Sequence, residues 1–310
     1  MNAPSPSSRR VGLLTCSMAT DIDLFALLAR SVDEHVADDI RHYVVVPGAD
    51  LKQFAPYRTA QREIIAQEDI MPVRLRKLPT WLRHFAFLKA GLRRPVYLTP
   101  SNAVVRGWML QQLIKIEMSR RAEEDATMHI DSDVSFFRVL QHEDAFKGDK
   151  VRFFKAEGET KNPRHKPWVA SSCRFLDVPV PDHHLGHYIE NCVLWSSAVT
   201  HAMVERIEQV HDRPLHEVIF AADTMSEYYI YGIFADFLAA PDLLAPEDVS
   251  FCNSYWPSDE SEAVDFDSLR ARLQPKHCAM AIQSTHKLDV AERAALYQRA
   301  EKEMTRPDSA

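Results

Sequence analysis

Glycine is scarce in this sequence, with eight residues among 310. None of the eight stands in a G-x-G-x-x-G pattern or in a Walker-type loop. Both motifs need clustered glycines, because the backbone must approach a phosphate closely. The scarcity therefore argues against a dinucleotide-dependent oxidoreductase and against a P-loop nucleotidase.

Cysteine and long apolar runs are scarce as well. The five cysteines are odd in number and form no C-x-x-C pair, which is typical of reduced thiols in a core. No segment reaches the roughly 18 uncharged apolar residues of a membrane span. Residues 1–10 also lack the apolar centre of a secretion signal. We therefore expect a cytoplasmic protein, at most peripheral to the inner membrane.

A basic excess is missing too, since the formal net charge is -7 and the pI is about 6.1. This balance argues against a nucleic-acid partner. One basic stretch within residues 74–94 is a candidate for contact with an anionic lipid surface or an acidic acceptor. A solvated helix face or loop is the commoner explanation of such a stretch. Its basic residues are Arg74, Arg76, Lys77, Arg83, Lys89, Arg93 and Arg94.

What is present suits a large folded unit, because 46% of the residues are hydrophobic and 26% are charged. We expect a flexible N-terminus over 1–10 and a polar tail over 305–310. The residues between them, 11–304, are expected to form one domain. Its donor-binding half would be 11–140 and its acceptor-binding half 141–304.

The chain opens with a β-α-β pattern. Short apolar runs at 11–15 and 42–47 flank a stretch of helical periodicity at 21–31. An amphipathic helix at 108–118 then precedes an apolar strand at 127–131. Further helices are expected at 196–209, 226–238 and 290–303. The pattern predicts an α/β fold with a mostly parallel, Rossmann-like sheet and helices on both faces.

Parallel sheets of this kind bind ligands at the carboxyl ends of their strands. The segments Thr15 to Asp21 and Pro47 to Asp50 follow the first two strands. By position alone they are candidate nucleotide contacts, with Thr15 and Asp21 as the residues of interest.

The most informative motif is Asp131-Ser132-Asp133, after the 127–131 strand. Residues two apart on an extended strand project to the same side, so the two carboxylates converge and repel each other. A hard divalent cation, Mg²⁺ or Mn²⁺, is their natural partner and would neutralise a leaving pyrophosphate. A strand-end turn with capping carboxylates is the structural alternative.

The same letters occur in metal-dependent phosphatases of the haloacid-dehalogenase type, where the first Asp is the nucleophile. There the motif belongs to the first strand and Thr or Val follows it. Here it lies in the middle of the chain, with Ser135 in that place and no acidic pair downstream. The phosphatase stays as an alternative function.

An ordered set of short motifs extends over most of the chain. Its pieces include Tyr43-Val-Val-Val-Pro47, Gly107-Trp108, His129-Ile-Asp-Ser-Asp-Val134, Ser226-Glu-Tyr-Tyr-Ile-Tyr-Gly232 and Ile282-Gln-Ser284. In this set the sequence resembles bacterial glycosyltransferase-like proteins grouped under a domain of unknown function and related to GT-A nucleotide-diphospho-sugar transferases.

The resemblance implies a GT-A-like fold and transfer of a sugar from a nucleoside-diphosphate sugar to a glycan or cell-surface precursor. It also implies a metal held by Asp131 and Asp133. Related families often add a histidine from the C-terminal part of the chain, and His286 is the best-placed candidate for that third ligand. Lys287 would then meet the diphosphate as a point charge.

Glu227 and Asp223 are the candidate catalytic carboxylates on the acceptor side. Glu227 is expected to orient the acceptor hydroxyl or remove its proton, with Asp223 as the second choice. An acidic residue in the first turn of a helix capped by Ser226 needs no function to explain it.

The 108–118 helix carries Gln111, Gln112 and Lys115 among apolar residues, and these polar groups are candidates to line the cleft beside the aspartates. A plain amphipathic helix explains them almost as well. Trp168, Trp195 and Tyr228 are candidates to stack on acceptor sugar rings, although aromatic residues more often belong to the core.

The run His183, His184 and His187 allows a zinc interpretation, which the nearby prolines and the lack of a fourth ligand disfavour. A catalytically silent protein that binds a nucleotide or a sugar is the remaining alternative function.

Overall fold

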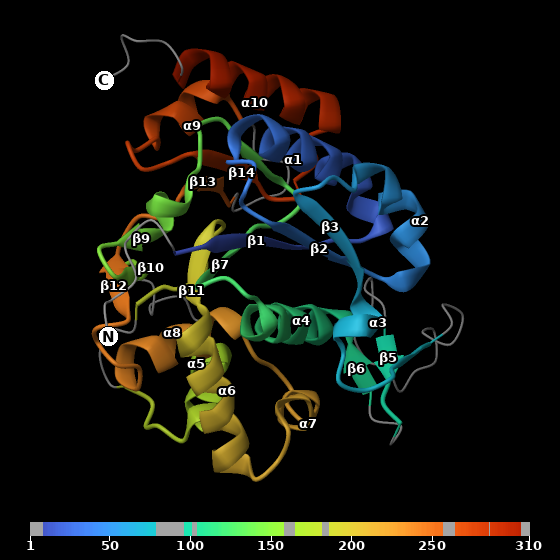
Figure 1. Cartoon of the computed structure of the whole chain (residues 1–310), viewed down its shortest axis with the longest axis vertical. Coiled ribbons are helices and arrows are strands. Elements are labelled where there is room, and N and C mark those ends of the chain that lie inside the picture. The colour runs from blue at the N-terminus through green and yellow to red at the C-terminus, as the bar shows by residue number, and fades with distance from the viewer. Residues whose placement is uncertain are drawn as a thin grey trace.

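A five-stranded sheet forms the centre of the molecule, with strand order β11-β7-β1-β2-β3 (Figure 1). The structure is a computed structural model that describes residues 9–78, 96–100, 104–157, 165–181, 186–256, 264–284 and 286–304. Strands β1, β2, β3 and β7 run parallel, and β11 pairs antiparallel with β7. The strands of this sheet are β1 Val11–Cys16, β2 His42–Val46, β3 Arg62–Ala66, β7 Ala126–His129 and β11 Val193–Ser196.

Helices cover both faces of this sheet. In Figure 1, α1, α9 and α10 lie above it, and α4, α5, α6 and α8 lie below it. The predicted α/β class with a mostly parallel sheet is therefore confirmed. The helices are α1 Ile22–His35, α2 Leu51–Phe54, α3 Gln67–Ile70, α4 Gly107–Arg121, α5 Lys166–Leu176, α6 Ser197–His211, α7 Leu215–Phe220, α8 Glu227–Phe237, α9 Phe266–Ala271 and α10 Val290–Met304.

The β-α-β opening is confirmed in detail. Helix α1 buries Phe25, Leu28 and Val32, which recur at the three- and four-residue spacing of a helical face. It connects β1 to β2, and the two strands pair parallel from Leu13 opposite His42 onward. The periodicity of the sequence thus predicted both the elements and the pairing.

The order of the strands creates a switch point beside β1. From β1 the chain proceeds outward to β2 and β3, and then returns through α4 to place β7 on the other side of β1. The loops after β1 and β7 diverge at such a point, which opens the edge where ligands bind in this class of fold.

Three smaller sheets surround the central one, in the orders β12-β10-β9, β13-β14-β8 and β4-β5-β6. In the second of these, β13 and β14 run parallel and β8 pairs antiparallel with β14. Their strands are β4 Arg76–Lys77, β5 Val96–Leu98, β6 Val104–Arg106, β8 Val134–Phe136, β9 Phe146–Lys147, β10 Lys150–Phe154, β12 Leu244–Glu247, β13 Cys252–Tyr255 and β14 Ala279–Ile282.

A buried polar chain fastens β1, β2 and β3 to α1. The fully buried Arg62 donates from Nε to His42 Nδ1 at 3.0 Å and from Nη2 to Asp33 Oδ1 at 2.6 Å. The other ring nitrogen of His42 lies 3.0 Å from the hydroxyl of Thr15. Burial, aided by Arg62, lowers the pKa of His42 well below its ordinary value, so the ring stays neutral. The polar side chain of Thr15 thereby belongs to the interior.

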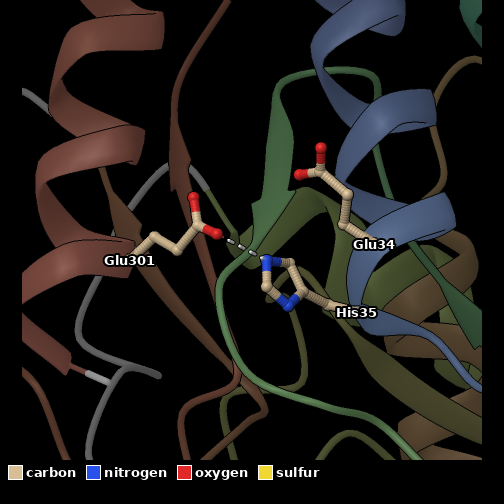
Figure 2. A group of neighbouring side chains, drawn as sticks. All are labelled: Glu34, His35 and Glu301. Carbon is tan, nitrogen blue, oxygen red and sulfur yellow. Dashed lines mark ion pairs between the residues drawn. The ribbon is translucent and has the colours of Figure 1, made fainter. Parts of the chain in front are cut away.

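Helix α10 docks on α1 through an ion-pair group (Figure 2). His35 Nε2 lies 3.4 Å from Glu301 Oε1, and Glu34 stands beside them. Within the described residues, this is the only trio of His, Cys, Asp or Glu side chains whose ligand atoms all lie within 4.8 Å of one another. Arg30 already pairs with Glu34 at 2.9 Å, so a guanidinium supplies the positive charge here. We interpret the trio as a polar contact that joins α10 to α1.

Several predicted features fall outside the described residues: segments 1–8 and 305–310, His183, His184, and four of the seven basic residues between 74 and 94. The division into donor and acceptor halves stays a prediction. Within the described part of the chain, no helix combines the length and the apolar character needed to cross a bilayer.

Candidate functional site

The acidic triplet lies in a turn, not on an extended strand. Strand β7 ends at His129, and the amide of Val134 donates to the carbonyl oxygen of Asp131 at 3.2 Å. The prediction that alternation along a strand aligns the two carboxylates is therefore wrong in its geometry. The two groups are still close enough that the Asp131 charge acts on Asp133. The turn brings them together because it folds the chain back into β8.

The triplet lies at the switch point of the central sheet. Ser132 Oγ donates to Ser17 Oγ at 2.8 Å, which joins the loop after β7 to the loop after β1. The amide of Ala19 in the same loop donates to Asp50 Oδ2 at 2.9 Å. Three strand ends thus meet at one edge, and the predicted ligand-binding segments after β1 and β2 contact each other there.

Lys115 is the centre of this site. Its Nζ lies 3.5 Å from Asp131 Oδ1 and 3.3 Å from Glu227 Oε1, and it donates to the Tyr228 hydroxyl at 2.9 Å. Burial alone would lower the pKa of Lys115, but Asp131, Tyr228 and Glu227 outweigh it and hold that pKa well above its ordinary value. Lys115 is thus a buried cation that joins the triplet to helix α8.

Helix α8 begins where the sequence predicted, and its first turn carries Glu227 into the site. Ser226 caps the helix, with its side chain accepting from the amide of Tyr229. The amide of Glu227 donates to Gln112 Oε1 at 2.9 Å, so a predicted cleft residue on α4 holds the first turn of α8. Burial raises the pKa of Glu227, and Lys115 offsets part of that rise.

The cap of α8 gives a stability prediction. Replacing Ser226 with Ala is expected to lower the free energy of unfolding by about 1 kcal/mol, because an orphan amide of the first turn loses its acceptor. Chemical denaturation followed by circular dichroism measures the change. Ser226→Asp, which keeps a side-chain acceptor, is the matched control. Equal stability of Ser226→Ala and the parent protein would contradict the capping role.

Asp133 is buried, with 8% of its surface exposed. Its Oδ2 accepts from the amide of Ser284 at 2.7 Å, whereas its Oδ1 has no hydrogen-bond partner among the described residues. Burial and the neighbouring Asp131 carboxylate together raise the pKa of Asp133 to about 7. A buried carboxylate oxygen without a donor is suited to contact a cation or a proton.

The loop that carries Ser284 is held from α10. The buried Arg293 donates to the carbonyl oxygens of Gln283 and His286, both at 3.0 Å. Tyr297, one turn further on, donates to the carbonyl oxygen of Asp133 at 2.7 Å. Helix α10 therefore fixes both sides of the contact between Ser284 and Asp133, a role that nothing in the helical pattern of 290–303 predicted.

Asp131 and Asp133 have the chemistry that suits a divalent metal. The carboxylates offer hard oxygen ligands. The side chain of Asp131 is partly exposed, and the buried Oδ1 of Asp133 has no hydrogen-bond partner among the described residues. His286 Nδ1 accepts from the amide of Leu288 at 3.1 Å. Among the described residues, Asp131, Asp133 and His286 do not form a group whose ligand atoms all lie within 4.8 Å of one another, and His286 as a third ligand stays a prediction.

The other predicted donor-side residues differ in their surroundings. Thr15 points into the core network described above. Asp21 lies in the short helical turn before α1, where its Oδ1 accepts from the hydroxyl of Thr20 at 3.2 Å. Lys287 is exposed, and Gln111 is half-buried on α4. Asp223 is exposed in the loop before α8, and no contact recorded among the described residues joins it to Lys115.

The three aromatic residues predicted on the acceptor side differ in burial and in their contacts. Trp195 is 2% exposed and stacks on Tyr231 at 4.6 Å, so the predicted sugar-stacking role is not available to it. The reason is that β11 is buried on both faces. Trp168 is partly exposed but stacks on His165 at 5.0 Å. Tyr228 belongs to the site through its hydroxyl, which contacts Lys115.

Cys16 is a site neighbour that the sequence analysis assigned to the core. It is the last residue of β1, and Lys115, Asp131 and Glu227 all act on it electrostatically. Burial raises the pKa of its thiol to about 12, so the thiol stays protonated and unreactive. Its place at the carboxyl end of a strand was the signal available in the sequence.

Comparisons with known proteins give a family match and likenesses to solved structures. A model of a family of unknown function, DUF6492, matches residues 13–298. No curated protein matches the sequence significantly. Among solved structures, a crystal structure of the galactosyltransferase LgtC in complex with donor and acceptor sugar analogs is similar. It shows 13% identity and a TM-score of 0.48, with 96% of this chain and 98% of that chain covered.

Proposed function

The chain belongs to the DUF6492 family, and on that premise we propose that it is a glycosyltransferase that uses a nucleoside-diphosphate sugar as donor. The observation that carries the proposal is the site at the switch point. Two adjacent carboxylates, one with an unpartnered buried oxygen, lie beside a buried Lys–Glu pair. Such an arrangement suits a reaction in which a diphosphate leaves and a hydroxyl arrives.

On the donor side, Asp131 and Asp133 would hold a divalent metal, Mn²⁺ or Mg²⁺. When bound, the metal supplies positive charge to the leaving diphosphate. Ser17 and the loop after β1 border the same edge and would contact the nucleotide. The amide of Ser284 keeps Asp133 turned toward the edge, and Arg293 keeps that amide in place.

On the acceptor side, Glu227 would orient the incoming hydroxyl and accept its proton. Burial raises the pKa of Glu227, which brings a carboxylate closer to the range of a general base. Lys115 holds this carboxylate and the Tyr228 hydroxyl in fixed positions. Because Lys115 also lies 3.5 Å from Asp131, a charge change on the donor side acts directly on the acceptor side.

The test is titration calorimetry with UDP, GDP and CMP compounds, each with and without Mn²⁺. We expect one class of nucleotide to bind, at least 10-fold more tightly with Mn²⁺ than without it. Asp131→Asn is expected to abolish the Mn²⁺ effect, whereas Asp23→Asn, an exposed carboxylate in the first turn of α1, is the matched control. Binding that is independent of Mn²⁺, or no binding at all, would contradict the proposal.

The two alternative functions are distinct outcomes of further assays. Release of phosphate from an aryl phosphate, with no nucleotide required, would identify a phosphatase with Asp131 as nucleophile. Nucleotide binding without hydrolysis of any nucleotide sugar over a long incubation would identify a binding protein. The triplet follows β7 and not the first strand β1, which favours the glycosyltransferase over the phosphatase.

A further inference from the structure

Trp256 is an exposed aromatic residue at the edge of the site. It immediately follows β13 and is 46% exposed. Strand β13 runs parallel to β14, so both end at the same edge, and the amide of Gln283 after β14 donates to the carbonyl oxygen of Tyr255. The next residue, Ser284, donates to Asp133. Trp256 therefore stands one strand away from the backbone that contacts the acidic centre.

Glu190 reaches the same edge from the segment that precedes β11. The indole Nε1 of Trp256 donates to Glu190 Oε1 at 3.4 Å, and the same oxygen accepts from the amide of Asn191 at 2.8 Å. The next residue, Cys192, has a left-handed φ of 56° and donates from its amide to the carbonyl oxygen of His129. His129 ends β7, two residues before Asp131. The Trp256–Glu190 pair is thus fixed to both sides of the triplet.

This pair has the chemistry of a sugar-binding platform. An exposed indole face packs against the apolar C–H face of a pyranose ring, and a neighbouring carboxylate accepts hydrogen bonds from the ring hydroxyls. The hydrogen bond to Glu190 holds the indole ring in one orientation, so little rotamer freedom is lost when a ligand binds. Single exposed hydrophobic residues are common on proteins, but this one is anchored and borders a site.

We propose that Trp256 and Glu190 form the acceptor subsite, and that the acceptor is a glycan whose terminal pyranose stacks on the indole. The assignment of this subsite to the acceptor rests on the proposed function, whereas sugar binding by the pair can be tested by itself. It differs from the predicted platforms Trp168, Trp195 and Tyr228, of which Trp195 is buried in the core.

A second exposed aromatic residue provides a control. Among the exposed large hydrophobic side chains of the described residues, only Phe237 and Trp256 are aromatic, and Phe237 is 52% exposed. Phe237 ends α8, ten residues after Glu227, which places it about 15 Å along the helix axis from the site. Its removal should leave sugar binding unchanged.

The experiment is saturation-transfer NMR on the metal-free full chain, with methyl β-glucopyranoside and methyl β-galactopyranoside as probes. We expect transfer to the axial ring protons of at least one probe. Trp256→Phe should keep that signal, Trp256→Ala should weaken binding about 10-fold, and Phe237→Ala should bind as the parent protein does. No signal from either probe, or equal binding by Trp256→Ala, would overturn the proposal.

Calorimetry separates this inference from the proposed function. Trp256→Ala is expected to bind the nucleotide with Mn²⁺ as tightly as the parent chain, because the indole does not touch the acidic centre. Sugar binding that depends on Trp256, without any nucleotide binding, would keep the platform and overturn glycosyl transfer. Nucleotide binding together with sugar binding that does not depend on Trp256 would keep the proposed glycosyl transfer and overturn the platform.

Discussion

Replacing Lys115 with Met is expected to lower the free energy of unfolding by about 3–5 kcal/mol at pH 7. The side chains of Lys115 and Glu227 are 5% and 7% exposed, and Nζ also contacts Asp131 and the Tyr228 hydroxyl. Removing the ammonium leaves a buried carboxylate beside a second one with no cation between them. Urea denaturation followed by tryptophan fluorescence measures the loss.

A second replacement tests the cause of that loss. In the double variant Lys115→Met, Glu227→Gln, the buried negative charge is gone, and we expect at least half of the lost stability to return. Arg30→Met, which breaks an exposed pair with Glu34, is the comparison for an ordinary ion pair and should change stability far less than Lys115→Met does. A double variant no more stable than Lys115→Met would mean that packing, and not charge, governs this position.

Much of the site was predictable because its residues follow regular elements. Asp131, Glu227 and Lys115 each stood out as a polar group at the end or on the face of an apolar element, and the structure brings all three together. Parallel strands share a carboxyl edge, and a capped helix delivers its first turn to a definite place. The predicted resemblance to a family of unknown function is confirmed by the family match.

The residues that escaped prediction reach the site from a distance. Arg293 holds the loop after β14 by contacts with backbone carbonyls, and such contacts leave no trace in the sequence around either partner. Trp256 directly follows β13 and meets Glu190, which lies three residues before β11, and the pairing of β13 with β14 was not predicted. The sugar-stacking prediction for Trp195 was wrong for a related reason, because the burial of β11 depends on tertiary packing and not on the local sequence.

Replacing Asp133 with Asn is expected to change how stability depends on pH. Burial and Asp131 raise the pKa of Asp133 to about 7 in the metal-free folded protein, against about 3.9 in an unfolded chain. Between those values the folded state keeps a proton that the unfolded state has lost. The stability contributed by this proton is present below pH 4 and is lost as the pH rises to 7, at up to about 1.4 kcal/mol per pH unit.

In Asp133→Asn the side-chain amide stays neutral at every pH tested, and its oxygen can still accept from the amide of Ser284. We therefore expect the variant to exceed the metal-free parent protein in stability by about 2–4 kcal/mol at pH 8, and to differ little from it at pH 4.5. Urea denaturation in the presence of a chelator, at intervals across this range, measures both. Asp23→Asn is the control for the loss of an exposed carboxylate. Parallel stability profiles for Asp133→Asn and the parent would contradict the raised pKa.

At pH 8, Mn²⁺ should reverse the order of stability of the parent protein and Asp133→Asn. A divalent cation can take the place of the missing proton at Oδ1 of Asp133, so saturating Mn²⁺ is expected to stabilise the parent protein strongly at pH 8 and weakly at pH 5. Asp133→Asn lacks the charge that holds the cation, and its unfolding curve should not respond at either pH. A metal that stabilised the variant as much as the parent would have to bind elsewhere. The acidic turn after β7 would then be a set of capping carboxylates, which is the structural alternative that its sequence allows.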